Sequence, residues 1–174
     1  SLFMSIGATI EAVAAALIKS RSSLRIITNN IHVAALVSGR SDYTVIITSG
    51  VVRPLDGGVT GVATVDFINQ FKVDYAVLST HGVEGDGSLL DYDYKEVSVM
   101  QAMMANARVR FLGVDHSKFQ SHALVRLGDI TDFDRVFTDR APDGEMQKIL
   151  TAAGVEWLVP EICQHATETA KDEK

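Results

Sequence analysis

The hydrophobic positions along the chain alternate between short apolar runs and longer segments in which apolar residues return with a helical period. The short runs predict strands at residues 2–6, 24–28, 43–48, 75–78, 109–114, 123–125, 135–138 and 156–159. The periodic segments predict helices at residues 10–19, 31–37, 60–71, 96–106 and 143–153. Strands that alternate with helices are typical of an α/β domain, in which crossover helices flank a mostly parallel, Rossmann-like sheet.

The chain is expected to form one main domain followed by a short tail. A length of 174 residues makes a single core over residues 1–161 the simplest arrangement, and residues 162–174 form a polar C-terminal tail. Residues 79–94 predict a long irregular loop, and residues 117–130 are a candidate for a small flap. The first strand begins at Leu2 without a polar lead-in, which indicates that a partner domain precedes it in the natural protein.

Charge and cysteine content narrow the class of protein. The 16 Lys and Arg and 22 Asp and Glu residues give a formal net charge of -6, which opposes binding to nucleic acid phosphates. Cys163 is the only cysteine and cannot form an internal disulfide, so we expect a cytoplasmic protein. The apolar runs are too short to cross a membrane. The histidines lack the spacing of a metal site, and neither a metal nor another cofactor is expected.

Polar segments follow four of the predicted strands, at the edge where open parallel sheets bind their ligands. Gly7, Ala8 and Thr9 lead from the first strand into a helix, whose free N–H groups and positive dipole end predict an anion site. Thr28 and Asn29 follow the second strand and offer a hydroxyl and an amide group. The ordinary explanations for these residues are a strand-to-helix turn and a helix cap.

The other two segments follow the strands at 75–78 and 109–114. Thr80, His81 and Gly82 place a histidine beside the long loop, where it is a candidate hydrogen-bond donor or general base. Lys118 can bring a flexible positive charge to a phosphate group. A loop histidine and a surface lysine without function are the ordinary alternatives.

Acidic side chains gather in and after the long loop. Asp93 and Glu96 are two of them, and they either belong to a solvated charged loop or accept hydrogen bonds from the hydroxyl groups of a polyol. Gly57 and Gly58 resemble a phosphate loop only superficially, because the Gly-Lys-Thr of nucleotide-binding loops is absent. The sequence also has no Gly-x-Ser-x-Gly elbow and no plausible Cys–His pair, so nucleophilic hydrolysis has no support.

Several stretches match, in order and spacing, the C-terminal effector-binding domain of a known family. They are residues 6–9, 24–30, 56–58, 66–71, 86–90 and 114–119. From residue 2 to about residue 160, the sequence resembles DeoR-family transcriptional repressors. The resemblance implies a fold related to ribose-5-phosphate isomerase and CoA transferases, preceded by a winged helix–turn–helix that reads operator DNA.

The same resemblance implies a homo-oligomer, dimer or tetramer, whose operator binding weakens when a small phosphorylated polyol or sugar binds. Glycerol 3-phosphate is the favoured ligand. The phosphate and neighbouring oxygens would contact Gly7, Ala8, Thr9, Thr28, Asn29 and Lys118. The remainder of the pocket would be lined by Thr80, His81, Gly82, Asp93 and Glu96.

Three positions depart from the family pattern. Ser5 stands where the family has an acid, Ala8 replaces a threonine, and Met100 replaces a lysine. A sugar-phosphate isomerase-like enzyme is the main alternative, but residues 79–83 carry no carboxylate for proton transfer and no Lys-Gly-Gly segment occurs. An oligomerisation module with a decayed pocket is the third hypothesis. We expect a sensor domain that is not an enzyme.

Overall fold

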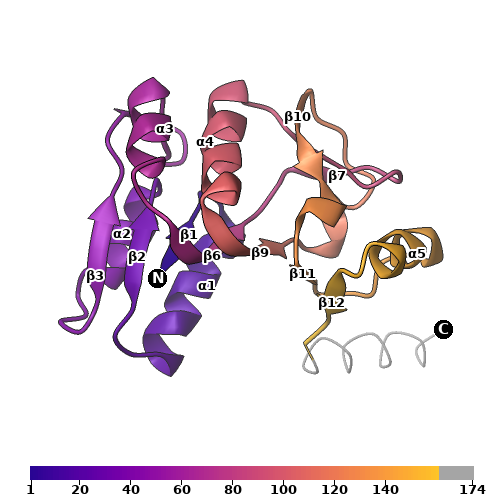
Figure 1. Cartoon of the computed structure of the whole chain (residues 1–174), viewed down its shortest axis with the longest axis horizontal. Coiled ribbons are helices and arrows are strands. Elements are labelled where there is room, and N and C mark those ends of the chain that lie inside the picture. The colour runs from indigo at the N-terminus through magenta and orange to yellow at the C-terminus, as the bar shows by residue number, and fades with distance from the viewer. Residues whose placement is uncertain (161–174) are drawn as a thin grey trace.

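The computed structural model describes residues 1–160, and the predicted tail at 162–174, with Cys163, lies outside the described residues. A seven-stranded sheet forms the centre, and every neighbouring pair of its strands is parallel (Figure 1). Across the sheet, the strands are β12 (Glu156–Leu158), β11 (Arg135–Phe137), β9 (Ala107–Gly113), β6 (Val73–Leu78), β1 (Leu2–Met4), β2 (Arg25–Thr28) and β3 (Thr44–Ile47). The predicted α/β class with a mostly parallel sheet is confirmed.

Helices cover both faces of this sheet (Figure 1). Two pack on one face, namely α1 (Ala8–Ser20) and α2 (Ile31–Val37). Two pack on the other face, namely α3 (Val62–Ile68) and α4 (Tyr94–Ala105), while α5 (Gly144–Ala152) contacts β12. Four of the five predicted helices agree with these bounds to within two residues. None of the helices in the described part of the chain is long and apolar enough to cross a membrane.

The central strand β1 is buried from both sides because its side chains alternate between the two faces. Leu2 and Met4 pack in one hydrophobic cluster with Ile10 and Ala14 of α1. Phe3 points the other way, into the larger cluster beneath α3 and α4. A parallel strand covered on both faces needs such an uninterrupted apolar run, which is why the pattern predicted this strand clearly.

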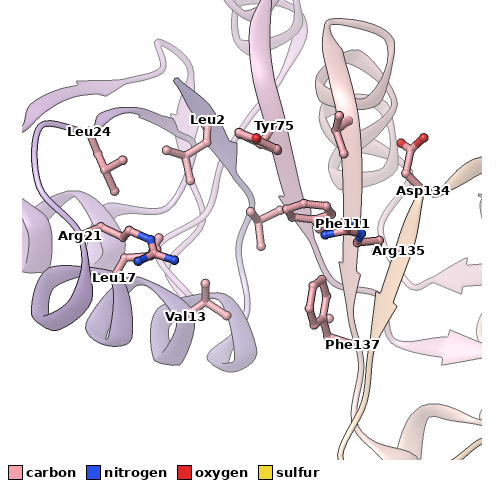
Figure 2. A pocket seen from close by; sticks show the side chains of 13 residues that line it. Leu2, Val13, Leu17, Arg21, Leu24, Tyr75, Phe111, Asp134, Arg135 and Phe137 are labelled. Carbon is pink, nitrogen blue, oxygen red and sulfur yellow. The ribbon is translucent and has the colours of Figure 1, made fainter. Parts of the chain in front are cut away.

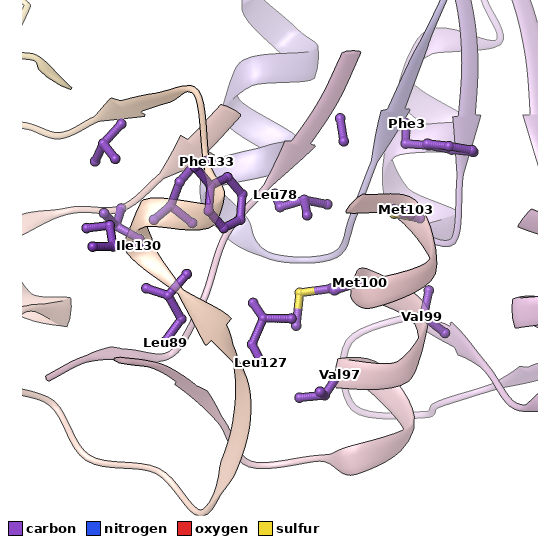
Figure 3. Close-up of a cluster of buried hydrophobic side chains, with 14 of the residues drawn as sticks. Phe3, Leu78, Leu89, Val97, Val99, Met100, Met103, Leu127, Ile130 and Phe133 are labelled. Carbon is purple, nitrogen blue, oxygen red and sulfur yellow. The ribbon is translucent and has the colours of Figure 1, made fainter. Parts of the chain in front are cut away.

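The larger hydrophobic cluster joins α4 to a second, smaller sheet (Figure 3). Met100 and Met103 of α4 are almost fully buried, as are Leu89 and Leu127 of the smaller sheet. Met100 therefore contributes to core packing at the position where the family pattern has a lysine. A lysine at this site would place a charge among apolar side chains.

The irregular loop predicted at residues 79–94 is wrong in part, because two strands lie within it. β7 (Gly82–Val83) and β8 (Ser88–Asp91) pair antiparallel, and β10 (Val125–Asp129) pairs with β8 to complete a three-stranded sheet. Strands this short contain too few alternations to stand out from the Gly- and Asp-rich turn between them. The strand predicted at 123–125 is displaced for the same reason and corresponds to β10.

The helix predicted at residues 60–71 is shorter than expected, since α3 begins only at Val62. Before it, β4 (Val51–Val52) and β5 (Val59–Thr60) pair antiparallel and form a hairpin that the sequence pattern did not predict. β9 begins at Ala107, two residues before the strand predicted at 109–114. Two short 3-10 helices, η1 (His116–Lys118) and η2 (Ile130–Asp132), complete the described elements.

Beside α1, the strands β6, β9 and β11 leave part of their face open. They and the flank of α1 enclose a groove of about 720 Å³ (Figure 2). Val13 and Leu17 of α1 line one side of this groove, and Tyr75, Phe111 and Phe137 of the strands line the other. The groove is therefore mainly apolar, and it lies along the strands.

Candidate ligand site at the carboxyl ends of the strands

The four polar segments singled out in the sequence lie on four adjacent strands. The strand order β2–β1–β6–β9 places Thr28, Gly7, Thr80 and Lys118 after consecutive strands of the sheet. Because these strands are parallel, their carboxyl ends meet at one edge. The structure thus brings together the segments that the sequence separates by up to about a hundred residues.

The start of α1 offers unpaired backbone donors at the middle of this edge. Gly7 is the N-cap, with φ 120° and ψ 149°, a conformation that favours glycine, and no side chain caps the helix. The first helical bond runs from Glu11 N–H to Gly7 C=O at 3.0 Å, which leaves the amides of Ala8, Thr9 and Ile10 without an intrahelical acceptor. These amides and the helix dipole favour an anion here.

Neighbouring contacts fix where this helix begins. A Cβ atom added to Gly113 would lie 3.3 Å from Cγ2 of Thr9, so the first turn of α1 reaches over the end of β9. A Cβ atom on Gly7 would lie 4.0 Å from Cβ of Ser79, after β6. Ser5, at the position of the family's acid, is buried and donates a hydrogen bond to the carbonyl of Ile6.

Thr28 and Asn29 are fully buried at the end of β2. The Thr28 hydroxyl donates to the Met4 carbonyl at 2.7 Å and accepts from the Asn30 amide at 3.0 Å, so it ties β2 to β1. Asn29 donates through Nδ2 to the Val59 carbonyl at 3.1 Å, and its Oδ1 has no partner among the described residues. Asn30 caps α2 by accepting from two backbone amides. Of the two predicted ligands, Asn29 alone retains an unpaired polar atom.

Of the three predicted residues after β6, only His81 presents a polar side chain to solvent. Thr80 is buried and donates to the Leu90 carbonyl at 2.7 Å. A Cβ atom on Gly82 would lie 2.3 Å from the Ser121 carbonyl oxygen, so any other residue here would force the backbone to shift. Nδ1 of His81 lies 3.0 Å from Oδ2 of the buried Asp91, and this hydrogen bond raises the pKa of His81.

An arginine that the sequence analysis missed holds both predicted acids. Arg53, in the loop of the β4–β5 hairpin, contacts Asp93 through Nη1 at 2.7 Å and Glu96 through Nη2 at 2.7 Å. Nε of the same guanidinium donates to Asp56 at 3.1 Å. One cation thus faces three carboxylates from the hairpin and α4. Its only sequence signal was that residues 43–62 contain no other basic residue.

Glu96 is the most perturbed of these acids. Its side chain is 4% exposed, and burial raises its pKa to about 7, with the charge of Asp91 adding to the rise and Arg53 opposing it. Asp93 also accepts from the Lys95 amide and so forms the N-cap of α4. The two acids therefore anchor the hairpin and the helix at the edge of the candidate site.

Lys118, in η1, is half-buried, and its ammonium group makes no hydrogen bond or ion pair with a described residue. It lies near His81, whose protonation its charge opposes. The edge therefore combines two positive elements, Lys118 and the start of α1, with the carboxylates Asp91 and Glu96. Within residues 1–160, no group of three or more His, Cys, Asp or Glu side chains could hold a metal ion.

An open parallel sheet with unpaired donors and charged side chains at its carboxyl edge is the architecture of a small-ligand-binding α/β domain. Comparison with known proteins identifies the family within this class. The family model of the DeoR C terminal sensor domain matches residues 1–140, and the chain belongs to this family.

Curated relatives agree with this assignment. The chain is 45% identical over 151 residues to the glycerol-3-phosphate regulon repressor of Escherichia coli (strain K12). The aligned residues cover 87% of this chain and 60% of the relative. The repressor of the same name from Haemophilus influenzae is 45% identical over 144 residues, covering 83% and 56%. The HTH-type transcriptional repressor CsqR of Escherichia coli is 34% identical over 161 residues, covering 92% and 61%. The chain thus spans about 60% of the length of these relatives.

Two solved structures are similar in part. Ribose 5-phosphate isomerase from Plasmodium falciparum gives a TM-score of 0.46 at 12% identity, covering 69% of this chain and 45% of that one. Ribose 5 phosphate isomerase A from Neisseria gonorrhoeae gives a TM-score of 0.44 at 13% identity, covering 70% of this chain and 46% of that one.

Proposed function

We propose that the chain is the effector-sensing domain of a DeoR-type transcriptional repressor and that it binds a small phosphorylated polyol or sugar, with glycerol 3-phosphate favoured. The relatives are named as repressors, two of them of a glycerol-3-phosphate regulon, which supports a regulator over an isomerase-like enzyme. Operator binding in the cytoplasm would belong to a winged helix–turn–helix of the longer protein, and the assembly would be a homo-oligomer.

The observation that carries this proposal is the start of α1 at the centre of the strand edge. Three adjacent amides without helical acceptors, next to the uncapped Gly7, suit the oxygens of a phosphate. Lys118 makes no salt bridge within the described residues, although its charge lowers the pKa of the neighbouring Asp115, and it supplies the positive charge that a phosphate monoester requires. The carboxyl oxygens of Asp91 and Glu96 could accept hydrogen bonds from ligand hydroxyl groups in addition to their contacts with His81 and Arg53.

Calorimetric titration with glycerol 3-phosphate, and with pentose and hexose phosphates, tests the assignment. Lys118→Ala should weaken binding by about 1.5–3 kcal/mol, the cost of a hydrogen bond to a charged group. Lys148→Ala is the matched control, since that lysine lies on α5 and contacts Glu145. Equal affinity of Lys118→Ala and parent for every phosphate would refute the phosphate position.

Thr28→Val, measured in the same series, shows whether Thr28 serves mainly to stabilise the fold or to bind the ligand. The buried Thr28 hydroxyl joins β1 and β2, so its removal should lower the free energy of unfolding by about 1–3 kcal/mol. Asn29→Asp keeps Oδ1 but replaces the Nδ2 group that donates to the Val59 carbonyl with a second oxygen, so it should repel an anionic ligand and also lower the free energy of unfolding. Failure of the parent to bind any of the phosphates would favour the oligomerisation module with a decayed pocket.

A further inference from the structure

The β4–β5 hairpin and its flanks carry an unusual share of exposed apolar side chains. We define the hairpin surface as Ile47, Val51, Val52, Leu55 and Val62. Their exposed fractions run from 45% at Ile47 to 95% at Leu55, and they make up five of the eleven large hydrophobic residues exposed in the described chain. They also occupy only 16 consecutive positions.

The fold keeps these residues close together. Three residues separate the end of β3 from the start of β4, so Ile47 and Val51 lie on one short stretch. Val51 pairs with Thr60 of β5, and Val62 follows two residues later. Exposed apolar residues scattered singly are ordinary, whereas a contiguous group marks an interaction surface.

The hairpin and its flanks carry few charges, and those charges are paired within the chain. Residues 43–62 contain only two charged side chains, Arg53 and Asp56, which pair with each other. Arg53 is turned further inward by its contacts with Asp93 and Glu96 of α4. A chain of net charge -6 repels its own copies, and a surface without net charge adds least to that repulsion. The hairpin surface meets that condition.

The adjoining strand β3 provides backbone groups that are complementary to those of an identical strand. It ends the seven-stranded sheet, and its bonds to β2 use alternate residues, such as Thr44 N–H to Leu24 C=O and Thr48 N–H to Thr28 C=O. The peptide groups of Val45 and Ile47 consequently face outward. β3 itself contains no charge and no proline, the usual devices that protect an edge strand.

We propose that the hairpin surface and the outer edge of β3 form a two-fold contact with a second copy of this chain. The proposal deepens the oligomeric part of the proposed function by naming the surface. A two-fold contact uses the same patch on both subunits, which an apolar surface and an edge strand of one sequence satisfy together. The groove beside α1 is a poorer surface for this purpose, because it is concave and bordered by the charges of Arg21, Asp134 and Arg135 (Figure 2).

Sedimentation equilibrium of the unliganded chain tests the proposal. Leu55→Lys and Val51→Lys should each weaken self-association by roughly 100-fold, because a two-fold contact contains every substitution twice and each copy costs about tenfold. Leu124→Lys is the matched control, since Leu124 is 88% exposed and lies outside the hairpin surface. Phe137→Lys probes the groove, and both controls should associate like the parent.

The outcomes separate the two surfaces. A parent chain that remains monomeric at several hundred micromolar would overturn the proposal, as would dissociation by Phe137→Lys or Leu124→Lys but not by Leu55→Lys. Circular dichroism and thermal unfolding of each variant check for misfolding, which is not expected at Val51, Leu55 and Leu124 because these side chains are strongly exposed. The experiment contains no phosphate ligand, so failure here leaves the effector assignment untouched, and calorimetry on Leu55→Lys reports on that assignment separately.

Discussion

The raised pKa of Glu96 predicts that the domain loses stability as the pH rises from 5 to 8.5. The carboxyl has an ordinary pKa of 4.5 in the unfolded chain and a pKa of about 7 in the folded chain. Between these values the unfolded state has released the proton that the folded state retains, so deprotonation favours unfolding. At 1.36 kcal/mol per pK unit the full penalty is about 3 kcal/mol, of which roughly 2.5 kcal/mol develops in this pH window.

Urea unfolding at half-unit pH steps, followed by the fluorescence of Trp157, measures this slope. Glu96→Gln removes the ionisation but keeps an oxygen that can accept from Arg53, so its free energy of unfolding should lose about 2.5 kcal/mol less than that of the parent between pH 5 and 8.5. Glu145→Gln is the matched control, because the Glu145 side chain is 78% exposed. Its pH dependence should follow the parent.

His81 also makes the domain less stable as the pH rises, and its effect must be measured separately from that of Glu96. The pKa of His81 is raised by Asp91, so His81 stabilises the fold below its ordinary pKa and loses that contribution as the pH rises through its folded value. His81→Gln measures this part alone. Carboxyls with lowered pKa values, such as Asp42 and Asp56, lose their contributions only as the pH falls and do not enter the window. Parallel pH profiles for parent and Glu96→Gln would refute the reasoning.

Three further predictions concern stability, and urea unfolding measures each. Gly82→Ala should destabilise by about 1–3 kcal/mol, because its Cβ would lie 2.3 Å from the Ser121 carbonyl oxygen; a shift below 0.5 kcal/mol would contradict the close approach. Met100→Lys should unfold much of the population by burying a charge without a partner, whereas Met100→Leu should cost less than about 1.5 kcal/mol. Asp143→Ala should cost about 1 kcal/mol by removing the cap to the Met146 amide, and Asp143→Asn should retain most of it.

Elements with several periods of their pattern were predictable from the sequence. Ile26 and Ile27 of β2 lie in opposite clusters, and an apolar run of this kind is readable because both faces of the strand are buried. The hairpin of β4 and β5 was not predictable, since strands of two residues are too short to show an alternation of apolar and polar positions. Its position depends on contacts distant in sequence, such as Asn29 Nδ2 to the Val59 carbonyl.

The location of the candidate site at the carboxyl edge of the sheet was predictable from the sequence, but the side-chain contacts within it were not. Gly7 could be recognised because a glycine between a strand and a helix has a local backbone reason. Arg53 could not, because its partners Asp93 and Glu96 lie about 40 residues away. Thr28 follows a strand as a ligand would, yet a polar residue at a strand end also serves to join neighbouring strands, and only the fold distinguishes the two.

Arg53 links the two surfaces that this fold exposes. Its guanidinium is bound to Asp56 within the hairpin and to Asp93 and Glu96 on α4, so the hairpin is held at the edge of the candidate ligand site by charge. Glu96, with a pKa of about 7, changes protonation near neutral pH, and a negative ligand nearby would favour its neutral form. A neutral Glu96 attracts Arg53 less, which weakens the hold on Val51 and Leu55. If a ligand binds at the strand edge and a second copy at the hairpin surface, as proposed, this one guanidinium would couple the two sites.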